Sequence, residues 1–498
     1  MVNALLFTST KMSHNMYIRT SGSYRIATEI RKAGYTCQVI DFFDMFSYNE
    51  YKKIIDKYVN DKTLMIGFSN TFMNVGNLPS YYKLHFPCIF DVKDRMEYLI
   101  SLAKNKNKYI KSVIGGPRTM NLNPEDYPYI DLFALGYADE SVIEILHKIE
   151  NEKDTISKNK IIDGYPVKPF KNFKFTESKI EWTEHDFIDR NETLPIEISR
   201  GCKFKCAFCN FMLTGRGNYK MGDYVKCEKT LYEEFMSNYE KYGTTNYYFC
   251  DETLNESIEK LEHLHGIIKK LPFKIQYSSF MRHDLIYHHK DMAEIMLDMG
   301  LRSAIFGIET FSDSAGKIIG KGLGQEKTKE LLFLLKNNLW KNDVSIHSSF
   351  ICGLPTESPE EFKLNILSYF SSPTCSLDSL SITPLFTFPE KNNENVIRYN
   401  LLSKFEKQKI FNIVNKDNIT IVNDSWNSLD MMNVINEINN NEIIKQSRKI
   451  STWFLMFLLQ FMKFDDIRVM KLEDAIKNQT LMTLLYQKIL KYKIRILN

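Results

Sequence analysis

The stretch Leu194-Pro-Ile-Glu-Ile-Ser-Arg-Gly-Cys-Lys-Phe-Lys-Cys-Ala-Phe-Cys-Asn210 decides the fold of the central part of this chain. It contains Cys202, Cys206 and Cys209 in the spacing C-x3-C-x2-C, with Phe208 directly before the last cysteine. The apolar residues at its beginning predict a short buried strand. The cysteines are therefore expected on the loop that leaves the carboxyl end of that strand.

Three thiolates on one short loop can hold three corners of an iron–sulfur cube, because thiolate sulfur is the ligand that iron–sulfur clusters use. The cube has four irons, so the fourth iron would have no protein ligand and would be open to a small molecule. This spacing predicts a reactive [4Fe–4S] site rather than a simple electron store.

Other uses of these cysteines fit the sequence less well. Structural zinc normally takes four ligands in two spaced pairs, and no second pair follows at the expected distance. The chain has nine cysteines, an odd number, scattered over 498 residues, which disfavours a disulfide framework. An inert buried cysteine is the ordinary alternative for any single position.

The segment Ser199-Arg-Gly-Cys-Lys-Phe-Lys-Cys-Ala-Phe-Cys209 resembles the signature of the radical S-adenosylmethionine (SAM) superfamily. The chain on both sides is similar to the subgroup that carries a cobalamin-binding domain. The resemblance implies that the open iron chelates SAM and that reductive cleavage of SAM gives a 5′-deoxyadenosyl radical, which abstracts a hydrogen atom. It also implies an external electron donor such as flavodoxin or ferredoxin. The motif carries no information about the substrate.

Length and composition are those of a globular protein with two or three domains. The net charge of +4 is nearly balanced for this size, so there is no strong signal for binding nucleic acid or a membrane. The N-terminus lacks the features of a signal peptide, and the longest apolar run, residues 450–462, is too short to span a bilayer. We therefore expect a cytoplasmic location.

Residues 1–150 alternate short apolar runs with helical segments, which predicts a doubly wound, Rossmann-like parallel sheet. In such sheets ligands bind beyond the carboxyl ends of the strands, where glycine lets a ligand approach the backbone. The order of elements resembles a cobalamin-binding domain. The candidate cobalamin-binding residues are Ser69, Gly115, Gly116 and Gly136.

The loop after the first strand departs from the usual cobalamin pattern. Many cobalamin proteins carry an Asp-x-His-x-x-Gly loop there, whose histidine ligates cobalt. Here the loop reads Thr8-Ser-Thr-Lys-Met-Ser-His-Asn-Met-Tyr17, with His14 but without Asp and Gly at the required spacing. A solvated loop histidine is the expected role of His14. A domain that binds substrate, or nothing, in place of cobalamin is an open alternative.

The remaining chain divides into three predicted regions. Residues 151–190 are polar, contain prolines and lack a hydrophobic period, which predicts a linker. Residues 191–390 predict six strand–helix units, similar to the partial (β/α)6 barrel of the superfamily, with the site at the strand carboxyl ends. Residues 391–498 predict a helical C-terminal cap, which would exclude water from radical chemistry.

Polar residues follow successive strands of the predicted barrel. A carboxylate suits the ammonium group of SAM because the pair is charge-assisted, and a guanidinium can clamp its carboxylate in bidentate fashion. A helix cap or a surface ion pair is the ordinary alternative for each residue alone. The SAM-binding residues that the resemblance implies are Phe208, Asp251, Glu252, Ser279, Arg282, Glu309, Ile351 and Gly353.

The residues that act on the substrate are unknown from the sequence. Cys250 and Cys352 are weak candidates, expected at strand ends that face the barrel cavity, and buried structural cysteines are their alternative. The expected reaction modifies an unreactive C–H position of a small metabolite or peptide. It would be methyl transfer if cobalamin binds, and cyclisation or rearrangement if it does not. An iron–sulfur protein that senses redox state is the alternative outside the enzymes.

Overall fold

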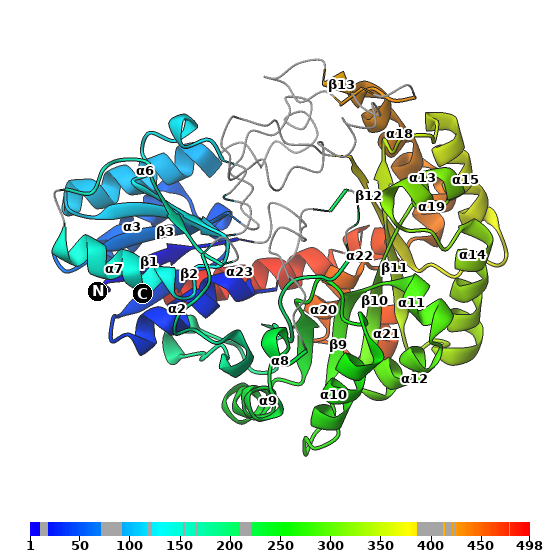
Figure 1. Cartoon of the computed structure of the whole chain (residues 1–498), viewed down its shortest axis with the longest axis horizontal. Coiled ribbons are helices and arrows are strands. Elements are labelled where there is room, and N and C mark those ends of the chain that lie inside the picture. The colour runs from blue at the N-terminus through cyan, green and yellow to red at the C-terminus, as the bar shows by residue number, and fades with distance from the viewer. Residues whose placement is uncertain are drawn as a thin grey trace. The chain divides into compact units, whose positions relative to one another are not determined.

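The chain forms two compact units, Met1–Arg190 together with Met482–Asn498, and Asn191–Leu481 (Figure 1). Each unit contains one six-stranded parallel sheet. The computed structural model describes residues 1–9, 18–70, 92–116, 119, 122–152, 155–165, 168–204, 206, 208–209, 221–385, 412–413, 421–422, 425–477 and 479–498.

The sheet of the first unit has the order β2-β1-β3-β4-β5-β6, and all neighbouring strands are parallel. Its strands are β1 (Ala4–Phe7), β2 (Cys37–Ile40), β3 (Met65–Ser69), β4 (Lys111–Gly116), β5 (Leu132–Leu135) and β6 (Lys160–Asp163). The helices between them include α2 (Ser21–Lys32), α3 (Tyr48–Tyr58), α6 (Val92–Lys106) and α7 (Ser141–Asn151). The Rossmann-like doubly wound fold predicted for this region is confirmed.

Apolar packing on both faces explains why these short segments form strands. All four residues of β1 and of β2 are buried, as is typical of a parallel sheet covered by helices on both sides. The ring of Phe7 lies 5.6 Å from that of Phe43 and 5.5 Å from that of Phe68, centroid to centroid. The strand order reverses direction between β1 and β3, which is where sheets of this type bind ligands.

Residues 151–190 differ from the expected linker, because β6 adds an edge strand to the first sheet. A second stretch of the same segment is held by polar contacts. The Arg31 guanidinium donates to both carboxylate oxygens of buried Asp186, at 2.9 and 2.8 Å, and Arg19 donates to the Asp186 carbonyl at 2.8 Å. Such contacts leave no hydrophobic period in the sequence, which is why the segment reads as a linker.

Helix α23 (Thr480–Leu497) also differs from the expectation of a C-terminal cap. From Met482 onward it belongs to the first unit. Tyr492 packs edge-on against Phe42 with ring centroids 5.4 Å apart, and its hydroxyl accepts a hydrogen bond of 2.8 Å from the Asp41 backbone N–H. The last helix therefore completes the core of the N-terminal sheet.

The sheet of the second unit has the order β12-β11-β10-β9-β8-β7, so each strand pairs with the next one along the chain. All pairs are parallel, and β7 and β12 stand at the two edges, which is the arrangement of an unclosed (β/α)6 barrel. The predicted partial barrel is confirmed. The strands are β7 (Leu194–Ile196), β8 (Asn246–Phe249), β9 (Gln276–Met281), β10 (Leu301–Glu309), β11 (Ser345–Cys352) and β12 (Ser379–Pro384).

Helices follow the strands, and a further set comes after β12. The helices between strands are α8 (Met221–Tyr224), α9 (Glu228–Tyr242), α10 (Ile258–Ile268), α11 (His283–His288), α12 (Asp291–Asp298), α13 (Asp313–Ile319), α14 (Gln325–Leu334) and α15 (Pro359–Ser371). Those after β12 are α18 (Ser428–Asn440), α19 (Glu442–Ser447), α20 (Thr452–Leu458), α21 (Phe464–Arg468) and α22 (Leu472–Lys477). None of the helices that the structure describes has both the length and the apolar character to cross a membrane.

Helix α20 packs on the sheet face formed by β8, β9 and β10. The ring of Trp453 lies 5.1 Å from that of Tyr248 and 5.7 Å from that of Phe280. The hydroxyls of Thr452 and Ser303 are 2.6 Å apart. Apolar and polar contacts together fix this helix against the sheet.

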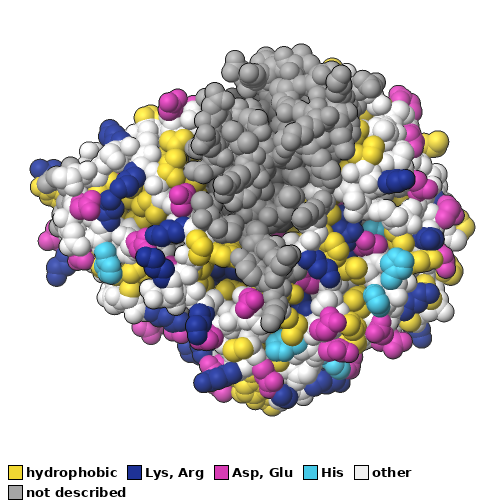
Figure 2. All heavy atoms as spheres, in the orientation of Figure 1, with side chains coloured by type: hydrophobic (Ala, Val, Ile, Leu, Met, Phe, Trp, Pro, Cys, Tyr) yellow, Lys and Arg dark blue, Asp and Glu magenta, His cyan; other side chains and the backbone are white. Residues whose placement is uncertain are grey.

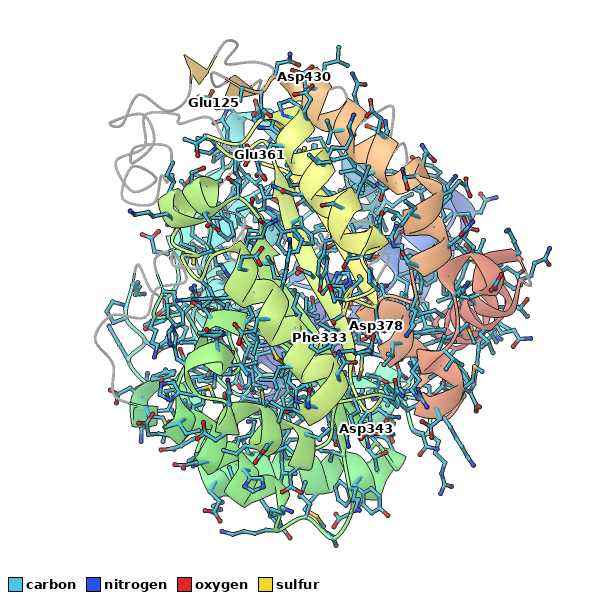
Figure 3. All side chains as sticks on the ribbon, turned by 90° about the vertical axis from the view of Figure 1, so that its right-hand side faces the viewer. Glu125, Phe333, Asp343, Glu361, Asp378 and Asp430 are labelled. Atoms are coloured by element: carbon cyan, nitrogen blue, oxygen red, sulfur yellow. The ribbon has the colours of Figure 1, made fainter. Side chains whose placement is uncertain are left out.

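Charged side chains hold the amino-terminal ends of the last two strands. Asp378, labelled in Figure 3, precedes β12 and accepts a hydrogen bond of 2.9 Å from the Ile346 N–H. It also forms ion pairs of 2.6 Å with Lys336 and 2.7 Å with Lys449. On the face drawn in Figure 2, basic and acidic side chains of the described residues are interspersed, as expected for a net charge of +4.

A buried histidine joins β11 to β12. His347 lies 2.8 Å from the Ser379 hydroxyl through Nδ1 and 3.2 Å from the Ser381 hydroxyl through Nε2. Burial and, as a smaller cause, the charge of Arg448 lower the pKa of His347 to about 3. The imidazole is therefore neutral in the folded protein at neutral pH.

We expect the pH dependence of stability to change in His347→Gln. Between about pH 3 and 6.5 the unfolded chain binds a proton at His347 that the folded chain does not bind. The free energy of unfolding therefore falls as the pH falls, by up to about 1.4 kcal/mol per unit from this residue. The measurement is urea unfolding at about pH 8 and about pH 5.5. The destabilisation caused by His347→Gln should be smaller at the lower pH. His185→Gln, at an exposed histidine, is the control. An equal loss of unfolding free energy in His347→Gln at both pH values would contradict a neutral, buried His347.

Candidate functional site

The cysteine loop begins at the carboxyl end of β7 and is tied to the end of β8 by one carboxylate. Asp251 lies two residues after the end of β8, and its Oδ1 accepts hydrogen bonds from the backbone N–H groups of Ile198 and Ser199, at 2.9 and 3.1 Å. Its Oδ2 accepts from the Ser199 hydroxyl at 2.6 Å. The sheet places these two strand ends side by side because β7 and β8 pair in parallel.

A lysine on α10 completes this buried anchor. The Lys260 ammonium lies 2.6 Å from Asp251 Oδ2, donates to the Ser199 hydroxyl at 2.6 Å and lies 3.5 Å from Glu256. Burial lowers the pKa of Lys260, but the carboxylates of Asp251 and Glu256 raise it by more, so the net shift is upward. The Lys260 and Asp251 side chains are both completely buried. Together they fix the first residues of the cysteine loop.

Arg282, at the end of β9, reaches the loop itself. Its Nη1 donates to the sulfur of Cys206 at 3.2 Å, and its Nε donates to Asp284 at 2.9 Å. Its Nη2 donates to the second oxygen of Asp284 and, at 3.3 Å, to the carbonyl of Gly320. The guanidinium carbon lies 4.2 Å from the centre of the Phe204 ring.

The three cysteines of the loop form no disulfide, and their exposure differs. Cys206 is buried, whereas Cys202 and Cys209 are half-buried. The N–H of Cys209 donates to the carbonyl of Cys206 at 3.1 Å, which closes a turn between them. Burial raises the pKa of Cys202, and its contact with the Thr253 hydroxyl at 3.5 Å opposes that rise.

The donor set of the loop fits an iron–sulfur cluster. Among the described residues, no three His, Cys, Asp or Glu side chains are gathered closely enough to hold a single metal ion. A cube binds each thiolate at a different iron, so its ligands need not converge on one point. Three cysteine thiols on one loop, with a cationic N–H donor beside one of them, match this requirement in number and chemistry.

Two glutamates stand near the loop. Glu252 is half-buried beside Asp251, and burial raises its pKa to about 8. Glu309 ends β10, and burial raises its pKa to about 7 although the charges of Lys321 and Arg282 oppose the shift. Glu309 has a φ of +71°, a strained conformation for a residue with a side chain, and the pairing of β10 with β11 shifts there. Strain of this kind gathers at functional sites.

The other predicted SAM-binding positions lie in β9, in β11, directly after β11 and in the cysteine loop. Ser279 is fully buried, with its hydroxyl 3.4 Å from the Phe249 carbonyl. Gly353 has a φ of +101°, and a side chain there would lie 2.6 Å from Met431 of α18. Ile351 is buried in β11. Phe208 is half-buried within the cysteine loop.

The two cysteines expected to face the barrel cavity differ from each other. Cys352 is fully buried, with its sulfur 3.6 Å from the Met431 carbonyl, so α18 covers it. This burial agrees with the structural role given as the alternative for Cys352. Cys250 is half-buried, with its sulfur 3.6 Å from the Tyr248 carbonyl.

The candidate cobalamin-binding residues come together at one edge of the first sheet. Ser69 pairs in register with Gly115, and Gly116 forms an isolated bridge with Gly136. A side chain at Gly136, whose φ is +73°, would come 2.4 Å from the Tyr165 carbonyl oxygen. The chain itself therefore requires glycine at this position. His14 lies outside the described residues.

Sequence reasoning missed several residues that hold the loop or the charged side chains beside it. Lys260 stands in the first turn of α10, where a positive charge is unfavourable to the helix dipole, and this placement is the signal of a specific partner. Asp284, two residues after Arg282, is a second visible signal of an ion pair. Phe204 and Lys321 carry no comparable signal.

Residues 196–366 match the family model of the Radical SAM superfamily. The chain contains a radical SAM domain. The matched range starts in β7 and ends within α15, so it includes the cysteine loop and the ends of β8 to β11. The predicted resemblance to the superfamily is confirmed.

Two curated relatives are methyltransferases by name. A protein described as an uncharacterised methyltransferase of Pyrococcus horikoshii is 24% identical over 282 residues, which are 53% of this chain and 59% of the relative. Bacteriochlorophyllide d C-8(2)-methyltransferase of Chlorobaculum tepidum is 24% identical over 235 residues, 44% of this chain and 49% of the relative. The chain thus spans only about half to three-fifths of the length of these relatives.

Solved structures share the fold over most of this chain. The radical S-adenosylmethionine methyltransferase TsrM of Kitasatospora setae, with cobalamin and a [4Fe–4S] cluster bound, matches with a TM-score of 0.57 and 14% identity over 82% of this chain and 75% of TsrM. The cobalamin-dependent radical enzyme OxsB, with aqua-cobalamin and SAM bound, matches with a TM-score of 0.55 and 13% identity. The match covers 87% of this chain and 66% of OxsB. At such identities the likeness concerns the fold alone.

Replacement of Lys260 by Met should destabilise the radical SAM domain by about 3–5 kcal/mol, because it leaves the Asp251 carboxylate buried without its cation. The measurement is urea unfolding. Lys269→Met, which breaks an exposed ion pair with Asp298, is the control and should cost about 0–1 kcal/mol. The double variant Asp251→Asn/Lys260→Met should recover part of the loss. A loss below about 1 kcal/mol in Lys260→Met would contradict the anchor.

Proposed function

We propose that this chain is a radical SAM enzyme that holds a [4Fe–4S] cluster on Cys202, Cys206 and Cys209. When bound, the cluster supplies one electron that cleaves SAM to methionine and a 5′-deoxyadenosyl radical. The observation that carries the proposal is the loop of three cysteines outside any disulfide at the end of β7, within the matched domain and beside the ends of β8 and β9.

Within this proposal the carboxylates after β8 have different roles. Asp251 already accepts from three donors of the cysteine loop and pairs with Lys260, so its part is to hold the loop. Glu252, half-buried beside it, is the carboxylate that we assign to the ammonium group of SAM. Glu309 at the end of β10 and Lys321 after α13 form an ion pair of 3.8 Å, which is a second charged group of the site.

The leading reaction is methyl transfer to an unreactive carbon with cobalamin on the first unit. The strand order of that unit, with its switch point between β1 and β3, supports a ligand at the carboxyl edge where Ser69 and Gly115 lie. The two methyltransferase relatives and the shared fold of two cobalamin-dependent enzymes support it further. A small metabolite or a peptide is the proposed substrate, and flavodoxin or ferredoxin the proposed electron donor.

A radical SAM reaction without cobalamin, such as cyclisation or rearrangement, is the second candidate. One observation favours it: the backbone of Tyr165 occupies the space that a side chain at Gly136 would take, so this glycine is explained without a ligand. The first unit would then serve another purpose, such as binding the substrate.

Anaerobic incubation of the reconstituted protein with dithionite and SAM should release 5′-deoxyadenosine, measured by liquid chromatography. Cys206→Ala should abolish both the cluster absorbance and this product, because Cys206 supplies one of three thiolates. Cys227→Ala, which removes an exposed cysteine after α8, is the matched control and should retain both. Undiminished 5′-deoxyadenosine from Cys206→Ala would show that the cysteine assignment is wrong.

Reconstitution with iron, sulfide and hydroxocobalamin, followed by desalting and a corrinoid assay, tests the cobalamin proposal. We expect about one corrinoid per chain, because the carboxyl edge of the first sheet has the topology of a ligand site. A protein with a full cluster and no corrinoid would contradict methyl transfer through cobalamin and favour the second candidate.

A further inference from the structure

The hydrogen bonds of Arg282 leave little of its side chain for a ligand. A guanidinium has five N–H groups. Four hydrogen bonds to described residues use four of them: two to Asp284, one to Cys206 and one to the carbonyl of Gly320. A bidentate clamp on a carboxylate of SAM needs two parallel donors. The geometry offers a different role from the one that the sequence resemblance implies.

The contact with Cys206 is both charged and sheltered. Arg282 is 6% exposed and Cys206 is 8% exposed, so solvent screens the interaction weakly. The pair joins the proposed cluster ligand to the end of β9. Hydrogen bonds to the sulfurs, net charge and solvent exposure set the reduction potential of iron–sulfur clusters. All three factors meet at this nitrogen–sulfur contact.

The surrounding residues hold the guanidinium in one orientation. Asp284 binds its far side through two oxygens, and the Phe204 ring lies 4.2 Å from its central carbon. Asn255 fixes the backbone, because its side chain accepts from the Arg282 N–H and donates to the Arg282 carbonyl, each at 2.8 Å. The N–H that points at the sulfur therefore needs no reorganisation when the charge of the sulfur changes.

We propose that Arg282 tunes the reduction potential of the cluster through its hydrogen bond to the Cys206 sulfur. The inference rests on the proposed function, since it requires the cluster. In the step concerned, the external donor loses one electron and the cluster gains it, and no bond forms or breaks. A buried cation with an N–H on a ligand sulfur favours the more negative, reduced state. Arg282 thereby raises the potential and makes reduction by a physiological donor easier.

The test is a redox titration followed by electron paramagnetic resonance on wild type, Arg282→Gln, Arg282→Lys and Lys203→Gln. At a fixed potential, Arg282→Gln should lower the ratio of reduced to oxidised cluster about tenfold, which corresponds to about 59 mV for one electron. Arg282→Lys keeps the charge without the planar fork and should lower the ratio less. Lys203→Gln removes an exposed charge from the same loop and should leave the ratio close to that of wild type.

The outcomes separate this inference from the proposed function. No cluster signal in the wild type would overturn the proposed function. If wild type and Arg282→Gln both hold a cluster and have the same ratio of reduced to oxidised cluster, the inference is overturned and the proposed function stands. If Arg282→Gln does not assemble a cluster, Arg282→Lys decides, and a ratio equal to that of wild type would overturn the inference. Equilibrium dialysis with SAM completes the test, because a loss of SAM affinity without a change of ratio would support the clamp instead.

Discussion

The buried ion pair between Lys260 and Asp251 is the interaction on which the rest of the site depends. A carboxylate that is completely removed from water costs several kcal/mol unless a cation and hydrogen-bond donors surround it. Asp251 meets this condition only with Lys260 from α10 and with N–H and hydroxyl groups from the start of the cysteine loop. The loop, the end of β8 and the first turn of α10 are therefore stable only together.

The parallel order of the second sheet places this ion pair on the same side of the sheet as the other site residues. Because every strand runs in the same direction, the residues that follow β7, β8, β9 and β10 lie along one edge. Cys206, Arg282 and Glu309 belong to that edge, and the positive φ of Glu309 is a cost that the packed strands around it sustain. At the opposite edge, the ion pairs of Asp378 hold the strand starts. Residues at the strand starts thus stabilise the sheet, and residues at the carboxyl ends of the strands form the proposed site.

In the first unit, polar contacts bring distant segments to a sheet whose own core is apolar. The Arg31–Asp186 pair holds residues after β6, and Tyr492 brings the last helix to Asp41. These additions explain why the unit contains both the expected linker and the end of the expected cap.

The sequence by itself determined the thiolate site and the strand plan, because both depend on residues that are close along the chain. The spacing of three cysteines is local, and apolar runs predicted the strands of both sheets except β6 to within a few residues at either end. Only the tertiary structure decided the partners of charged residues. Arg282 and Cys206 are 76 residues apart, and Tyr492 and Asp41 are 451 apart. Such pairs have no period and no fixed spacing, because the folded backbone alone sets the distance between their side chains. For the same reason Asp251 read as a ligand for SAM, whereas the fold surrounds it with the cysteine loop and Lys260.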